Sequence, residues 1–148
     1  MNIAILDAGT LGDDLSYDVL HQHGTVTAHT HTAPEQVAER LNGVQVAVVN
    51  KIKMNATTLN GVTDLKLICV AATGYDNIDL GYCKEHGIAV CNVPAYSTDS
   101  VAQITAAMVL SLTSHLTEFR NFVHGGEYSE GTIANRLTPY YHELSSMT

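Results

Sequence analysis

Short apolar runs that alternate with helix signals restrict the fold of this chain more than any other feature. The runs cover residues 2–6, 25–29, 45–49, 67–70 and 88–91. Most of them consist of apolar or β-branched residues, which is typical of strands buried on both faces of a parallel sheet. Gly24 and Gly43 close the first two intervening segments, as expected where helices end. Strands and helices therefore alternate along the chain.

This alternation predicts an α/β fold with a flavodoxin-like, five-stranded parallel sheet and helices on both faces. Right-handed crossovers are expected to join the strands. A first helix is predicted to follow Asp14 as its cap and to bury Val19 and Leu20. A second helix is predicted to begin with Thr32 as its cap and Pro34 in its first turn.

The most apolar helix is predicted to cover residues 99–123. Thr98, Asp99 and Ser100 are candidate caps, and Gln103 is placed for a capping-box contact. Apolar residues occupy nearly every side of this helix, so we expect it to be buried against a second domain or another subunit. The predicted organisation has three parts, namely a lobe of residues 1–98, a long interdomain or dimerisation helix of residues 99–123, and a connector of residues 124–148.

Composition excludes several classes of partner. The chain has 148 residues, of which 45% are hydrophobic, and a net charge of -8 with histidine neutral. This amount of apolar residue is enough for one domain with a buried core, and the negative charge disfavours nucleic-acid and membrane partners. No apolar run approaches a membrane span, and no signal peptide is visible. Three cysteines without metal-binding spacing indicate a reduced, cytoplasmic protein.

The loops at the carboxyl ends of the strands hold the candidate site, because ligands bind there in open parallel sheets. The loop after residues 67–70 is the most informative. Its backbone N–H groups are open to an anion, because the loop consists of two alanines followed by Thr73, Gly74 and Tyr75. Lys51 on the neighbouring loop adds a positive charge. These residues predict a site for a small carboxylate or phosphate. An ordinary turn that closes a crossover explains them equally well, and the sequence leaves both interpretations open.

Other motifs give weaker signals. Histidines occur in pairs at residues 21 and 23 and at residues 29 and 31, but no cysteine or acidic cluster completes a tetrahedral set, so no metal site is expected. The Gly-Thr-Leu-Gly turn at residues 9–12 departs from the GxGxxG dinucleotide fingerprint. No nucleophile elbow or Ser-His-Asp order is present, so the residues alone assign no catalytic group.

Five stretches of the sequence are similar to one enzyme family. They are ILDAGTLGDDLSYDVL (5–20), VVNKIKMNATTL (48–59), AATGYDNIDLGYCKEHGIAVCNVP (71–94), STDSVAQITAAMVLSL (97–112) and HELSSMT (142–148). On these residues the chain resembles the N-terminal part of the NAD-dependent D-2-hydroxyacid dehydrogenases. It is most similar to their glycerate dehydrogenase, or hydroxypyruvate reductase, branch. The stretch from residue 71 to residue 110 is the most specific part of the resemblance.

The resemblance implies a substrate-binding, flavodoxin-like lobe that is followed by a nucleotide domain. Transferred position by position, it implies that Asn50, Lys51, Thr73 and Gly74 line the substrate pocket, and that N–H groups from Thr73 to Tyr75 hold the substrate carboxylate. Val101 and Thr73 would contact the nicotinamide end of NAD or NADP. Gln103 stands where the family usually has Glu, which puts one helix-start contact in doubt.

The resemblance also implies what these 148 residues lack. The family's catalytic arginine, glutamate and acid/base histidine lie beyond residue 148, as does its GxGxxG motif, so we expect the isolated chain to have no dehydrogenase activity. The substrate would be a small 2-hydroxy or 2-oxo acid, and residues 99–122 would form a homodimer interface. Two alternatives remain, namely a non-catalytic module that dimerises or binds a small carboxylate, and a fragment that folds without a function.

Overall fold

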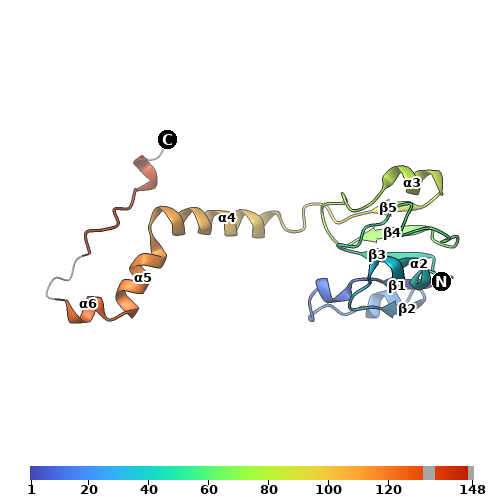
Figure 1. Cartoon of the computed structure of the whole chain (residues 1–148), viewed down its shortest axis with the longest axis horizontal. Helices are drawn as coiled ribbons and strands as arrows, with labels where there is room; N and C mark the ends of the chain where they lie inside the picture. The colour runs from blue at the N-terminus through green and yellow to red at the C-terminus, as the bar shows by residue number, and fades with distance from the viewer. Residues whose placement is uncertain (132–135, 147–148) are drawn as a thin grey trace. The chain divides into compact units, whose positions relative to one another are not determined.

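The computed structural model describes residues 1–131 and 136–146, which divide into two compact units, Met1–Tyr96 and Ser97–Thr148. The first unit contains the whole sheet, and the second is helical (Figure 1). Each unit is described below by itself.

The sheet of the first unit has five parallel strands in the order β2-β1-β3-β4-β5. The strands are β1 (Asn2–Ile5), β2 (Thr25–Ala28), β3 (Val46–Val49), β4 (Leu67–Val70) and β5 (Ala89–Cys91). All five lie within one or two residues of the predicted runs, and the order is the flavodoxin-like one. The predicted fold class is therefore confirmed.

One face of the sheet carries the hydrophobic core. Because side chains alternate along a strand, the residues that are paired across β1, β3 and β4 fall on the same side. Ala4, Ala47 and Ile68 form one such row and are all nearly inaccessible to solvent. They pack with residues from the crossover segments, namely Val37, Leu41, Met54, Leu59, Leu65, Ile78 and Cys83. This face is closed over β1, β3 and β4, whereas Thr27 on β2 is exposed and Val90 on β5 is half-buried.

The opposite face is unevenly covered. Its side chains form two rows across the sheet. One row is Ile3, Val46, Leu67 and Ala89, and the other is Ile5, Val48, Cys69 and Cys91. Ile3 and Ile5 on β1 are buried, the residues on β3 and β4 are half-buried, and those on β5 are exposed. Cover on this face therefore decreases from β1 to β5.

The first helix differs from its prediction. α1 (Asp18–His21) has four residues, begins after Tyr17 rather than Asp14, and leaves the side chain of Val19 65% exposed. The chain ahead of it turns at Gly12, whose φ of 92° belongs to the left-handed region. The predicted burial of Val19 is therefore wrong, and only a short turn of helix forms in this crossover.

The second crossover contains a 3-10 turn (Pro34–Gln36) that continues into α2 (Val37–Arg40). Thr32 is not its cap. The Thr32 hydroxyl donates instead to the carbonyl of Leu6, and the Ala33 N–H donates to Gln36 Oε1 at 3.0 Å. The last crossover contains α3 (Leu80–Glu85), which Asp79 caps by accepting from the Tyr82 N–H at 2.9 Å.

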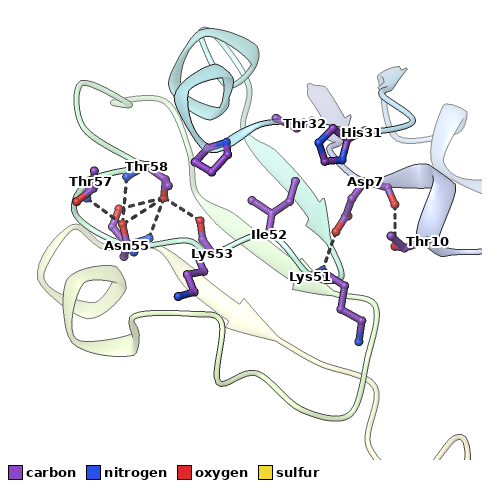
Figure 2. A pocket seen from close by; sticks show the side chains of 11 residues that line it. Asp7, Thr10, His31, Thr32, Lys51, Ile52, Lys53, Asn55, Thr57 and Thr58 are labelled. Carbon is purple, nitrogen blue, oxygen red and sulfur yellow. Dashed lines mark hydrogen bonds between the residues drawn. The ribbon is translucent and has the colours of Figure 1, made fainter.

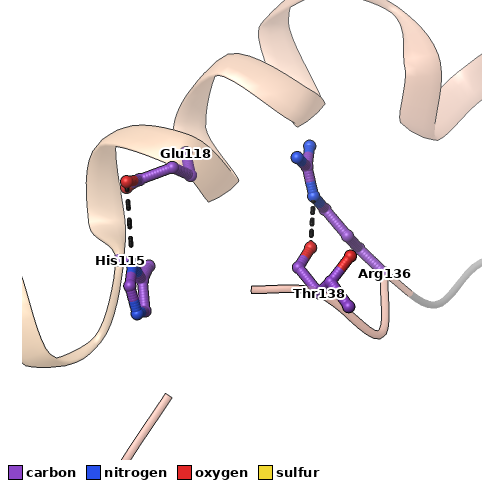
Figure 3. Close-up of polar contacts among 4 residues, drawn as sticks. All are labelled: His115, Glu118, Arg136 and Thr138. Carbon is purple, nitrogen blue, oxygen red and sulfur yellow. Dashed lines mark hydrogen bonds and ion pairs between the residues drawn. The ribbon is translucent and has the colours of Figure 1, made fainter. Parts of the chain in front are cut away.

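The second unit contains α4 (Thr98–Thr113), α5 (Leu116–His124), α6 (Glu127–Glu130) and a 3-10 turn (Leu144–Ser146). The range predicted as one helix is divided between α4 and α5. His115 has a φ of 49°, and its ring lies 3.6 Å from the carboxylate of Glu118 (Figure 3). The Thr113 hydroxyl donates to the Val109 carbonyl at 2.9 Å, a contact that often bends a helix.

α4 begins after Ser97, so the predicted caps Thr98, Asp99 and Ser100 lie inside its first turn. Gln103 then lies beyond the third helical position, where a capping-box side chain would have to be. Its apolar side chains are exposed, with Leu112 at 76%. Farther along, Arg136 Nε donates to the Thr138 carbonyl at 2.6 Å (Figure 3). Met147, part of the predicted connector, lies outside the described residues. Over residues 1–131 and 136–146, no helix has the length and apolarity that a membrane crossing requires.

Candidate functional site

A buried carboxylate joins the carboxyl ends of the neighbouring strands β1 and β3. Asp7 follows β1 and is 3% exposed. It accepts hydrogen bonds from the backbone N–H of Asn50 at 2.9 and 3.1 Å and from that of Lys51 at 2.6 Å. The Asn50 side-chain amide in turn donates to the Thr10 hydroxyl at 2.9 Å. These bonds fix the start of the loop after β3 against the end of β1.

The loop after β4 is anchored on both sides and open in its middle. The Thr73 hydroxyl donates to the Val93 carbonyl at 3.0 Å, and the Asn92 amide donates to the Thr73 carbonyl at 2.8 Å. Farther along, the Asn77 amide donates to the Ile52 carbonyl of the β3 loop at 2.8 Å. Hydrogen bonds to the segment after β5 and to the β3 loop thus hold the two ends of residues 73–77.

The middle of this loop offers unused donors. Thr73, Gly74 and Tyr75 are exposed, and within the described residues none of their three backbone N–H groups donates a hydrogen bond. A side chain at Gly74 would place its Cβ 3.2 Å from Asp76 Oδ1, which is tighter than ordinary contact. Three successive free N–H groups in an exposed turn suit an anion with two or three acceptor oxygens.

The predicted site residues of the first unit lie at one edge of the sheet. Asn50 and Lys51 follow β3, and residues 73–75 follow β4, the strand beside it. Lys51 is exposed, and its backbone is held by Asp7. Val101 belongs to the second unit, in the first turn of α4, and its side chain is 56% exposed. Its proposed contact with a cofactor stays a prediction.

A larger pocket, of about 560 Å³, lies beside this edge and was not predicted. Asp7, His31, Thr32, Ile52 and Thr58 contribute to its wall (Figure 2). The Ile52 side chain points toward Thr32 and His31, whereas the side chains of Lys51 and Lys53 extend to the opposite side of the same segment (Figure 2). The wall of this pocket therefore combines apolar surface with threonine hydroxyl groups, the Asp7 carboxylate and the His31 ring.

A smaller pocket of about 400 Å³ links the two loops of the predicted site. Asn50 lines it from the β3 side, Ala71 from the β4 side, and Val93 and Tyr96 from the segment after β5. The sequence places Asp7 at the end of β1, but the hydrogen bonds that it accepts from the β3 loop were not predicted. The bridging role of Asn77 was also missed, because it depends on a contact between two loops that no local pattern records.

Neither a metal nor a dinucleotide phosphate fits the remaining residues. The described part of the chain contains no group of three or more His, Cys, Asp or Glu side chains that could hold a metal. In the turn after β1, the N–H groups of Ala8, Gly9, Thr10 and Leu11 all donate to backbone carbonyls at 2.9–3.0 Å. Those four N–H groups are therefore not available to a pyrophosphate, which needs free N–H groups.

An open parallel sheet with anchored loops at its carboxyl edge defines the flavodoxin-like class of α/β ligand-binding domain. The model of the D-isomer-specific 2-hydroxyacid dehydrogenase catalytic domain matches residues 3–144. The chain therefore belongs to the D-isomer-specific 2-hydroxyacid dehydrogenase family, as the sequence resemblance predicted.

Individual relatives agree with this assignment. The glycerate dehydrogenase of Methylorubrum extorquens is 37% identical over 97 residues, which is 66% of this chain and 31% of that protein. The hydroxypyruvate reductase of Blautia hydrogenotrophica is 30% identical over 132 residues, 86% of this chain and 41% of that one. This chain therefore spans less than half the length of these relatives.

Solved structures support the same fold. The D-lactate dehydrogenase of Aquifex aeolicus, complexed with NAD and lactic acid, superposes with a TM-score of 0.73 at 28% identity. The match covers 93% of this chain and 41% of that one. An acyclic imino acid reductase has a TM-score of 0.80 at 19% identity over 97% of this chain and 45% of its own, a likeness of fold alone.

Proposed function

We propose that this chain is the substrate-binding part of a cytoplasmic NAD-dependent oxidoreductase acting on small D-2-hydroxy acids, of the glycerate, hydroxypyruvate or glyoxylate type. One observation carries the proposal. Three successive backbone N–H groups, from Thr73 to Tyr75, are free in an exposed loop whose two ends are anchored. Such a loop binds a carboxylate without first having to be ordered.

In this proposal the residues of the chain bind and orient the acid. The N–H groups of residues 73–75 donate hydrogen bonds to the carboxylate, which leaves the carbon that bears the hydroxyl or oxo group directed away from the loop. Lys51 contributes a positive charge that partly offsets Asp76 beside the loop. Asn50 is held by Thr10 and forms the wall toward β3.

NAD or NADP supplies or accepts hydride in such enzymes. Because the N–H groups of residues 8–11 after β1 are all paired with backbone carbonyls, we propose that the dinucleotide is held outside these 148 residues, with Val101 and Thr73 touching at most its nicotinamide end. The chain alone is then expected to catalyse no turnover. NADH oxidation with hydroxypyruvate or glyoxylate by the purified chain, above the rate without protein, would contradict this part of the proposal.

Carboxylate binding itself is tested by titrating the chain with oxalate and following its backbone amide resonances. We expect the largest shifts at residues 73–75. Lys51→Met should weaken oxalate binding by up to about fivefold, the equivalent of about 1 kcal/mol for one exposed charge. Lys66→Met is the matched control, because Lys66 is also exposed but precedes β4 at the opposite edge. Equal effects of the two substitutions, or largest shifts outside residues 73–75 and the adjoining residues 50 and 51, would refute the proposed carboxylate site.

A second candidate is a non-catalytic module that dimerises through residues 99–122. The observation in its favour is the exposed apolar surface of α4, on which Val101, Ile104, Met108 and Leu112 are all more than half exposed. Oxalate shifts at residues 73–75 separate the two candidates, because dimerisation alone does not produce them.

A further inference from the structure

Two cysteine thiols face each other across the last two strands of the sheet. Cys69 on β4 is paired in register with Cys91 on β5. The two Sγ atoms are 3.5 Å apart, and the Cys91 thiol donates to Cys69. Both cysteines are free, as is Cys83.

The pair lies on the poorly covered face of the sheet. Cys91 is exposed, and Cys69 is half-buried. Cys91 also lines a surface pocket of about 250 Å³ with Tyr75 and Asn92, so a small solute reaches its sulfur from solvent. Cys83, by contrast, is 1% exposed and belongs to the core on the other face.

The spacing of the strands permits a bond between the two sulfurs. Neighbouring strands lie about 4.8 Å apart. Disulfides join residues whose Cα atoms are about 4.4–6.8 Å apart. Only the side chains need to move, because the Sγ atoms must approach from 3.5 Å to about 2.05 Å.

We propose that Cys69 and Cys91 form an oxidation site, at which a hydroperoxide produces a reversible disulfide between β4 and β5. Sulfur of Cys91, as its thiolate, attacks one peroxide oxygen, so that an S–O bond forms and the O–O bond breaks. The departing oxygen takes up a proton. Cys69 sulfur then attacks Cys91 sulfur, the S–O bond breaks, and the Cys69 proton leaves with that oxygen as water. Each sulfur loses one electron, and the peroxide gains two.

The environments of the two thiols assign these separate roles. Burial, with a further contribution from the neighbouring Cys91 thiol, raises the pKa of Cys69 to about 12. Cys69 therefore keeps its proton in the resting state and serves as the resolving thiol. Cys91, which solvent reaches, is the sulfur that meets the peroxide first.

The bond would bear on the loop after β4. Cys91 directly precedes Asn92, which donates to the Thr73 carbonyl, and Thr73 donates to Val93. The disulfide would therefore lie directly beside the segment that anchors residues 73–75. The oxidation site itself depends only on the two thiols and stands whether or not that loop binds a carboxylate.

Hydrogen peroxide, tryptic digestion and mass spectrometry without reductant test the proposal. Cys69 falls in the tryptic peptide 67–84, and Cys91 in the peptide 85–120. We expect peroxide to link the two peptides with the loss of two hydrogen atoms, fragmentation to place the bond at Cys69 rather than Cys83, and dithiothreitol to release them. In Cys69→Ala the linked species should fall to background, with sulfinic acid accumulating at Cys91. Because Cys91 is exposed, Cys91→Ala is a second variant, which should also lose the link.

Three results would overturn the proposal. The first is sulfinic acid at Cys91 in the unmodified chain without any linked peptide. The second is a link that persists in Cys69→Ala. The third is a bond between two molecules, which an equal mixture of ¹⁴N- and ¹⁵N-labelled chains reveals as peptide pairs of mixed label.

Discussion

Replacing Asp7 by asparagine tests the hydrogen bonds that join the end of β1 to the loop after β3. In the native chain the carboxylate accepts from two backbone N–H groups, those of Asn50 and Lys51, at 2.6–3.1 Å. Asparagine has nearly the same shape but only one acceptor oxygen, so one N–H group faces the amide NH₂ and loses its partner. A hydrogen bond to a charged group contributes about 1.5–3 kcal/mol. We therefore expect Asp7→Asn to lower the free energy of unfolding by about 2–3 kcal/mol.

Urea unfolding followed by the amide resonances of β1 and β3 measures this change in the first unit alone. Asp64→Asn is the control, because Asp64 is exposed and precedes β4 at the opposite edge of the sheet. We expect that variant to unfold within about 0.5 kcal/mol of the native chain. If Asp7→Asn is no less stable than Asp64→Asn, the Asp7 carboxylate does not hold the β3 loop.

Three further predictions concern the rest of the molecule. Gly24→Ala would place a Cβ 1.9 Å from the Met1 carbonyl oxygen, so we expect a loss of about 2–3 kcal/mol in urea unfolding, while Gly81→Ala in α3 changes stability by less than about 1 kcal/mol. Folding raises the pKa of Cys69 from 9.0 to about 12, so with rising pH this thiol ionises in the unfolded chain before it does so in the folded chain. The free energy of unfolding should therefore fall as pH rises from 9 toward 12, and Cys69→Ala should flatten that slope. Sedimentation of the chain should show a dimer that Leu112→Ser weakens, and a monomer at high concentration would contradict the proposed interface.

The strands were predictable because burial imposes a local pattern. β4 was placed at its observed bounds, since a run of apolar residues is flanked by a charged residue and by a small-residue loop. The positions of Asn50, Lys51 and residues 73–75 at one edge follow from strand order alone, which right-handed crossovers restrict.

The missed features depend on contacts between distant residues. Asp14 and Val19 fit a helix pattern, yet α1 covers only Asp18–His21, and its first N–H group donates to the Ser16 hydroxyl rather than to Asp14. The break after α4 falls at His115, with no glycine or proline to signal it. Likewise, the hydrogen bonds that Asp7 accepts from the β3 loop can be recognised only once the fold places the ends of β1 and β3 side by side.

The uneven cover of the sheet implies a gradient of local stability. Amide protons in β1 and β3 should exchange with deuterium only on global unfolding, whereas those of β5 exchange through a smaller opening, because fewer apolar contacts are lost there. The loop of residues 73–75 is anchored to the segment after β5, so it is attached to the most easily released strand of the sheet. A ligand that orders this loop would therefore slow exchange in β5 first.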